Sequence, residues 1–195
     1  MNLLPVNREE AISYLRELGN ENTEMNHYIE TEAIMKKLAN HFCEDENYWR
    51  MLGLLHDIDW ILTKNKIQEH SLIAEELLLK LGFESDFISL VQSHVYSNEM
   101  IPKFLDKKRL SKIEFCLASS ETITGLIYAY ALMRNKNIST MEVKGLKKKF
   151  KDKTFAENCN REIIKEIEKT GISLDSFFQI AIDSLREIKN EIGLN

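Results

Sequence analysis

The chain has 195 residues, of which 44% are hydrophobic, and a formal net charge of −5 at pH 7. This apolar content excludes an intrinsically disordered chain and is enough for one domain with a sizeable core. The negative charge disfavours extensive binding to nucleic acid. With only 7 glycines and 2 prolines, the sequence predicts helices with short connections rather than a turn-rich β fold.

The cysteines and the N-terminal residues indicate an intracellular protein. Cys43, Cys116 and Cys159 are odd in number, widely separated and in no CxxC pair, which is typical of buried thiols in a reducing cytoplasm. Residues 1–5 carry no basic segment followed by a long apolar run, and we find no stretch of ~18 apolar residues that predicts a membrane span. We expect a cytoplasmic protein without a membrane partner.

Apolar residues at intervals of three and four predict three helices in the first part of the chain. The first covers residues 7–18 and the second residues 23–41. The third starts near Asp45, whose side chain is a plausible cap, and ends around His56 and Asp57. The polar His-Asp pair therefore closes an apolar helix, where each unpaired buried polar group costs roughly 1–3 kcal/mol.

The middle of the chain predicts three more helices after a polar connection at residues 63–66. They cover residues 69–81, 85–94 and 108–133. The last is apolar almost all round, which favours a central, buried element. Residues 119–122 interrupt it with polar side chains, Ser-Ser-Glu-Thr.

The remaining residues predict a helical extension. A strongly basic run, residues 144–153, precedes two helices over residues 154–169 and 173–192. The fold class is therefore all-α, and we expect a single domain with a core over about residues 23–135 and an extension over about residues 139–195.

Four histidines share one feature. His27, His56, His70 and His94 each lie on a predicted helix, at a helix start or on the apolar face. A single histidine of this kind is more often a core residue with satisfied hydrogen bonds than a ligand. Four of them, together with Asp57 beside His56, make a metal site as good an interpretation as a core role, since imidazole and carboxylate can bind the same divalent cation.

The order of these residues resembles the HD-domain superfamily of metal-dependent phosphohydrolases. Residues 54–60, 69–71 and 93–94 look like the subset that has two additional histidines and holds two metal ions. The resemblance covers about residues 23–135 and implies an HD-domain-like helical bundle. Residues 148–162 also resemble the tail of a largely uncharacterised bacterial branch of HD hydrolases.

Carried onto this chain, the resemblance implies two metal sites that share one carboxylate. The first would use His27, His56, Asp57 and Glu121, and the second would use His70 and His94 with Asp57 bridging. Glu121 stands where the family has an aspartate, which puts the first metal's affinity and identity in question. Such donors suit iron, manganese or zinc, with magnesium and nickel also open, bound as one or two ions per chain.

Three further residues near this constellation have less certain roles. Asp59 is interpreted either as a partner of a ligand histidine or a proton-transfer group, or as an exposed loop residue. Lys64 would contact a substrate phosphate, although a solvated loop lysine is the more common case. His41, at the end of a predicted helix, is expected at the surface. The catalytic candidates are thus His56, Asp57, Asp59 and Lys64.

The basic run at residues 144–153 has three interpretations. A solvated helix face is the most common case, contact with an anionic substrate is the second, and contact with nucleic acid is disfavoured because few aromatic residues interleave with the lysines.

Two functions follow from this constellation. The first is a phosphohydrolase acting on a phosphate ester of a nucleotide or small phosphorylated metabolite through a metal-activated water. The alternative is a catalytically weakened module that binds or senses a nucleotide or metal. The oligomeric state is not predicted.

Overall fold

The computed structural model describes residues 4–195, and in that range it contains helices and turns without a strand. The predicted all-α class is therefore confirmed. The expectation drawn from residues 1–5 falls partly outside the described residues. The helices, in chain order, are α1 Arg8–Glu17, α2 Asn22–Phe42, α3 Glu46–Leu55, α4 Trp60–Thr63, η1 Ile67–Glu69, α5 Leu72–Lys80, α6 Ser85–Gln92, η2 Ser93–Val95, η3 Pro102–Phe104, α7 Lys112–Met133, α8 Val143–Lys151, α9 Arg161–Lys165, η4 Glu166–Thr170 and α10 Leu174–Glu187.

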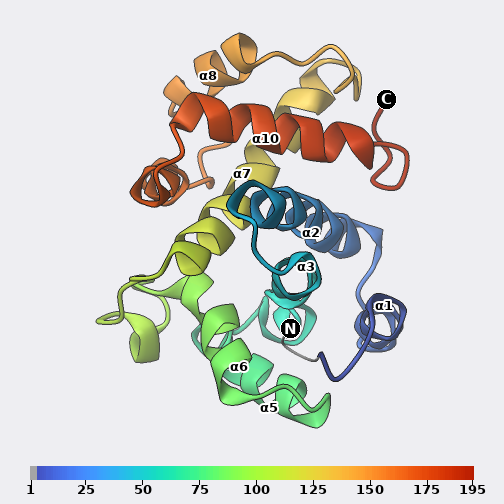
Figure 1. Ribbon diagram of the computed structural model, residues 1–195, viewed down its shortest axis with the longest axis vertical. Helices are drawn as coiled ribbons and strands as arrows, with labels where there is room; N and C mark the ends of the chain where they lie inside the picture. The colour runs from blue at the N-terminus through green and yellow to red at the C-terminus, as the bar shows by residue number, and fades with distance from the viewer. Residues whose placement is uncertain (1–3) are drawn as a thin grey trace.

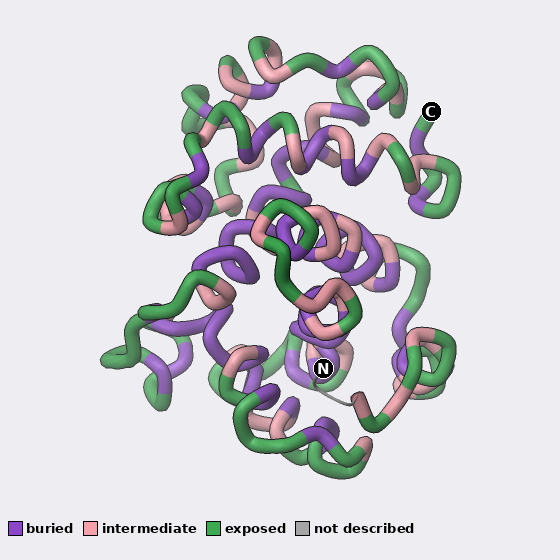
Figure 2. Tube along the Cα trace, in the orientation of Figure 1, coloured by how far each residue is buried: buried purple, intermediate pink, exposed green. Residues whose placement is uncertain are grey.

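Helix α7 is the central element of the molecule. It runs from the lower half of Figure 1, which holds α5 and α6, to the upper half, which holds α8 and α10. Much of it is buried, as Figure 2 shows. It is also long and apolar enough to cross a membrane by length and composition, which the sequence reading had not found, and 67% of its most apolar window is buried inside the protein.

Helices α2 and α3 make a close pair that brings His27 near His56. The contact depends on Gly53, because a Cβ atom there would lie 2.8 Å from the carbonyl oxygen of Thr31 and 2.9 Å from Cα of Glu32. The capping of α3 agrees with the prediction, since the Asp45 side chain accepts a hydrogen bond from the backbone N–H of Tyr48.

The C-terminal helices cover α7 and α2. Helix α10 packs on α2 and α8, and α7 packs on α9 and η4. Apolar residues from α1 through to Leu194 belong to one buried cluster. The division into a core and an extension stays a prediction, but both parts share this cluster.

Several predicted helix boundaries were wrong for local reasons. The long helix starts at Lys112 rather than about residue 108, because Ser111 and Glu114 form a capping box there. The helix predicted over residues 154–169 begins only at Arg161, after a turn, because the Asn160 side chain caps α9. The last helix ends at Glu187 instead of near residue 192.

The basic run forms helix α8, as the sequence predicted. Lys144, Lys148 and Lys151 are exposed, Lys147 pairs with Asp175 at 2.7 Å, and Lys149 lies over the rings of Tyr130 and Phe155. The cysteine prediction needs one correction: Cys116 is buried and Cys159 is half-buried, but Cys43 is exposed at the end of α2.

Candidate metal centre

Four histidines from four parts of the chain meet around one carboxylate. Nε2 of His27 lies 3.0 Å from Nε2 of His56, and Nε2 of His70 lies 3.2 Å from Nε2 of His94. Between the two pairs, one oxygen of Asp57 lies 3.6 Å from both nitrogens of the first pair. The other oxygen lies 3.3 Å and 3.1 Å from those of the second. Each group of three, one histidine pair with Asp57, can hold a metal ion.

The outer ring nitrogens fix which tautomer each histidine has. Nδ1 of His56 donates to the carbonyl oxygen of Gly53 at 2.8 Å, and Nδ1 of His94 donates to that of Val91 at 2.6 Å. Nδ1 of His70 donates to Asp59 at 2.9 Å. Because each acceptor has no proton to give, Nδ1 carries a proton, and each ring presents a lone pair at Nε2 whenever it is neutral.

The same argument applies to His27 through a threonine. The hydroxyl of Thr124 donates to the carbonyl oxygen of Glu121, so its oxygen is free to accept from Nδ1 of His27, 3.0 Å away. All four Nε2 atoms therefore converge on Asp57. Nitrogen lone pairs and a carboxylate at such short separations repel one another unless a proton or a metal cation lies between them, so this donor set fits a metal ion.

The electrostatics of the cluster favour metal-binding protonation states, with one exception. Burial lowers the pKa of His56 to about 3 and also lowers that of His27. Burial alone would raise the pKa of Asp57, but the surrounding histidines hold it well below its usual value. Burial would lower the pKa of His70, but hydrogen bonds to Asp57 and Asp59 outweigh it and raise the pKa to about 10. Metal binding at His70 must therefore release a proton.

Asp59 lies inside the protein, behind His70. It is fully buried, not an exposed loop residue. One oxygen accepts from Nδ1 of His70, and the other accepts from the backbone N–H groups of Ser71 and Ala74, at 2.7 Å and 3.1 Å. Both oxygens are thus engaged in holding His70 and the start of α5.

Two histidines predicted on α-helices lie outside them. His70 has an extended backbone, and Ser71 after it is left-handed with φ 63°, so α5 begins only at Leu72. The bonds from Asp59 to the N–H groups of Ser71 and Ala74 compensate for this strained turn. His94 lies in the 3₁₀ turn η2 that follows α6.

A buried arginine, which the sequence analysis did not identify, holds the turn that carries His94. Arg109 is 8% exposed, and its NH1 group donates to the carbonyl oxygens of Ser93, His94 and Tyr96 at 2.9 Å, 3.3 Å and 3.0 Å. Its Nε donates to Glu166, on η4, at 2.5 Å. Arg109 thus connects η4 of the C-terminal extension to the turn that carries His94.

The other predicted residues lie outside the two groups of three. Glu121 is near the cluster but accepts a hydrogen bond from the hydroxyl of its neighbour Thr122. Burial raises the pKa of its carboxyl to about 7. Lys64 lies 3.4 Å from a carboxylate oxygen of Glu24 and is partly exposed. His41 is exposed, as predicted. Thr124 was missed, although it lies three residues after Glu121, just beyond the polar interruption of α7.

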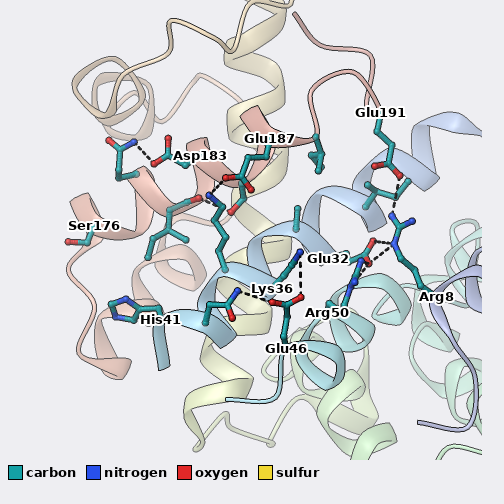
Figure 3. A pocket seen from close by; sticks show the side chains of 18 residues that line it. Arg8, Glu32, Lys36, His41, Glu46, Arg50, Ser176, Asp183, Glu187 and Glu191 are labelled. Carbon is teal, nitrogen blue, oxygen red and sulfur yellow. Dashed lines mark hydrogen bonds and ion pairs between the residues drawn. The ribbon is translucent and has the colours of Figure 1, made fainter. Parts of the chain in front are cut away.

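Two cavities differ in their relation to the cluster. One of about 1120 Å³ lies between α2, α3 and α10, and Figure 3 shows charged side chains in it paired with one another, as in Arg8–Glu32 and Lys36–Glu46. None of the described residues that line it belongs to the cluster. The other, of about 560 Å³, is lined by His94, Glu121 and Arg109 and so borders the cluster.

Comparison with known proteins agrees with this arrangement. The sequence model of the HD domain family matches residues 25–121. This chain belongs to the HD-domain superfamily. It carries the adjacent His56-Asp57 pair at the centre of the cluster, and this superfamily is one of metal-dependent phosphohydrolases. The resemblance to the HD-domain superfamily that the sequence predicted is therefore confirmed.

Two individual proteins resemble this chain at low sequence identity. An uncharacterized protein, L432, of Acanthamoeba polyphaga mimivirus is 26% identical over 184 residues, which cover 90% of this chain and 77% of the relative. Ribonuclease Y of Protochlamydia amoebophila is 24% identical over 171 residues, 87% of this chain, but the match spans only 32% of the ribonuclease. No solved structure matches significantly.

Proposed function

We propose that this protein is a metal-dependent phosphohydrolase that cleaves a phosphate ester of a nucleotide or small phosphorylated metabolite. The observation that carries the proposal is the convergence of four Nε2 atoms on the two oxygens of Asp57. This is a bridging arrangement, with one oxygen for each histidine pair. Membership of the HD-domain superfamily supports it independently.

In this proposal, His27, His56 and Asp57 hold one divalent cation, and Asp57, His70 and His94 hold the second. When bound, such a pair neutralises charge on the phosphoryl oxygens and acidifies the attacking water. Imidazole and carboxylate donors suit iron, manganese or zinc better than magnesium, and nickel is also compatible. Glu121 remains a predicted additional ligand of the first ion.

The remaining residues act on the ligands or on the substrate. Asp59 keeps the proton of His70 on Nδ1, and its two engaged oxygens support this positioning role more than proton transfer. The side chain of Lys64 is accessible to solvent, so its ammonium group would leave Glu24 and contact a phosphate of the substrate. The relative named Ribonuclease Y supports cleavage of a phosphate ester, while the net charge of −5 favours a small substrate over nucleic acid.

A second function has one observation in its favour. The carboxylate of Glu121 is hydrogen bonded to Thr122 and is absent from the histidine pair it was predicted to complete. This supports a weakened module that binds or senses a nucleotide or metal. In that case Glu121→Asp should restore turnover that the wild type lacks, whereas a fully active wild type that this substitution leaves unchanged argues against it.

The proposal is tested by comparing two histidine variants of the protein purified without chelator or metal-affinity column. His56→Ala should lose bound transition metal, measured by elemental analysis, and phosphate release from a panel of phosphate esters, while keeping its helical circular dichroism. His41→Ala is the matched control, because His41 is exposed and outside the cluster, and should keep both. Metal content and turnover that survive in His56→Ala would show the site assignment to be wrong.

A further inference from the structure

The cavity of about 560 Å³ beside the metal cluster is built by both parts of the chain. Residues of the loop after η2, among them Asn98 and Glu99, line one part of it, and Asn158 and Asn160 of the segment before α9 line another. His94 and Glu121 connect it to the cluster. Its volume is in the range of about 300–1,000 Å³ that holds small organic ligands. A substrate whose phosphate lies at the cluster would therefore place its organic part here.

The charges in the lining oppose a second phosphate. Glu99 contributes a carboxylate, Glu121 contributes a carboxyl group whose pKa burial raises to about 7, and the cation among the lining residues is Arg109. The guanidinium of Arg109 is paired with Glu166 through Nε and donates to three carbonyl oxygens through Nη1, and its side chain is 5% exposed. Lys107 is nearby, but its ammonium lies 5.3 Å from the Tyr96 and Phe104 ring centroids and it does not line the cavity. Among the described residues of the lining, the cation is thus already paired with a carboxylate.

Three asparagine side chains supply neutral hydrogen-bond donors to the lining of this cavity. The side-chain oxygen of Asn98 accepts from the N–H of Met100, and that of Asn160 caps α9, so each leaves its NH₂ group for another acceptor. Asn158 contributes a third amide to the same lining. Amide NH₂ groups bind hydroxyl and carbonyl oxygens, which are the acceptors of a sugar or a nucleobase.

We propose that this cavity binds the organic part of the substrate and selects phosphate monoesters of an uncharged, hydroxyl- or carbonyl-bearing group of up to nucleoside size. Nucleoside diphosphates and triphosphates are disfavoured, because their additional phosphates would lie beside Glu99 and Glu121, where the cation of the lining is already paired with Glu166. This inference rests on the proposed function only in placing the phosphate at the metal cluster.

Equilibrium binding tests the inference without requiring turnover. The full-length, manganese-loaded protein is titrated calorimetrically with non-hydrolysable methylenephosphonate analogues of adenosine monophosphate, adenosine diphosphate and ribose 5-phosphate. The two monophosphate analogues should bind about 10-fold or more tightly than the diphosphate analogue, a difference of about 1.4 kcal/mol. Comparing the two monophosphate analogues shows whether a nucleoside or a sugar is preferred.

Two variants identify the cavity as the origin of the preference. Glu99→Gln should reduce the difference in affinity between the mono- and diphosphate analogues several-fold, and Glu9→Gln, at an exposed position on α1, should leave this difference unchanged. Asn158→Leu should weaken the binding of the adenosine monophosphate analogue by about 3- to 10-fold, as expected for one lost hydrogen bond. Asn190→Leu, at an exposed position outside this lining, is its control.

The possible outcomes separate this inference from the proposed function. A diphosphate analogue that binds as tightly as the monophosphate, failure of all three analogues to bind, or an unchanged affinity in Asn158→Leu would overturn the inference even if the protein hydrolyses phosphate esters. If the analogues bind with the expected preference but the protein hydrolyses no phosphate ester, the cavity assignment would stand and the proposed hydrolase function would be contradicted.

Discussion

At the scale of single residues, Asp59 has the most specific role. Its fully buried carboxylate ties Nδ1 of His70 to the backbone of Ser71 and Ala74. Asn in its place has one oxygen and one NH₂ group, so it cannot accept all three hydrogen bonds.

Asp59→Asn should therefore weaken metal binding at the His70–His94 pair by roughly 10- to 100-fold, as is typical when the partner of a ligand histidine is removed. The measurement is calorimetric titration with Mn²⁺, with Asp86→Asn, at an exposed position on α6, as the control. Unchanged affinity at both sites would mean that Asp59 does not position His70.

Glu30 is a buried residue with no part in the proposed chemistry. It is 3% exposed, its Oε1 has no hydrogen-bond partner among the described residues, and burial raises its pKa from 4.5 to about 8. Between pH 4.5 and about 8 the folded protein holds a proton on Glu30 that the unfolded chain releases, so the contribution of Glu30 to stability is greatest below pH 4.5 and is lost as the pH rises towards 8.

Glu30→Gln removes this titration. The variant should be more stable than the wild type by on the order of 3 kcal/mol at pH 8 and by less than about 1 kcal/mol at pH 5. Urea unfolding followed by circular dichroism at the two pH values measures the difference, and Glu9→Gln is an exposed control. A gain that is the same at both pH values would contradict the assignment.

At the scale of elements, the two histidine pairs have different supports. His27 and His56 are held by the close contact of α2 and α3 at Gly53. His70 and His94 lie in short non-α segments. The second of these, η2, is held from outside by Arg109, which is in turn bound by Glu166 of η4.

Arg109→Ala should release η2 and leave three carbonyl oxygens without this donor. We expect a loss of roughly 2–4 kcal/mol in the free energy of unfolding, and weaker Mn²⁺ binding at the His70–His94 pair with the His27–His56 pair retained. Glu166→Gln should have the same effects to a smaller degree. Lys169→Ala, which removes the partner of the other Glu166 oxygen, is the control, because exposed pairs contribute about 0–1 kcal/mol. Equal loss at both metal sites would contradict this division.

Much of the element order follows from the sequence, since apolar periodicity and capping residues are local signals. The helices over residues 7–18, 23–41 and 45–57 agree closely with α1, α2 and α3. The error at His70 arises where a contact distant in sequence overrides local preference, because Asp59 turns the chain before α5. The error at residues 154–160 has a local cause, since Asn160 caps α9 and the Arg161 guanidinium binds carbonyl oxygens of the turn just before it.

At the scale of the whole molecule, the metal cluster joins distant parts of the chain, so a bound metal should stabilise the fold. Mn²⁺ at 100 times its dissociation constant should raise the free energy of unfolding by about 2.7 kcal/mol per independent site. Thermal unfolding with Mn²⁺ and with chelator measures this effect. The response should vanish in a His56→Ala, His94→Ala double variant and persist in His41→Ala. A metal-dependent shift that the double variant retains would place the metal elsewhere.

The sequence by itself determined the all-α class, most helices, and the ordered set His27, His56-Asp57, His70 and His94 that identifies the superfamily. These are properties of residue type and spacing along the chain. Only the tertiary structure decided which ring nitrogens face Asp57, that Asp59 is buried behind His70, and that Thr124 and Arg109 support the cluster. It also brought Asn158 and Asn160 of the extension to a cavity beside His94. These features depend on contacts between residues up to 97 positions apart, and such contacts form only when α7 packs on α2 and the extension packs on α7, which no local pattern records.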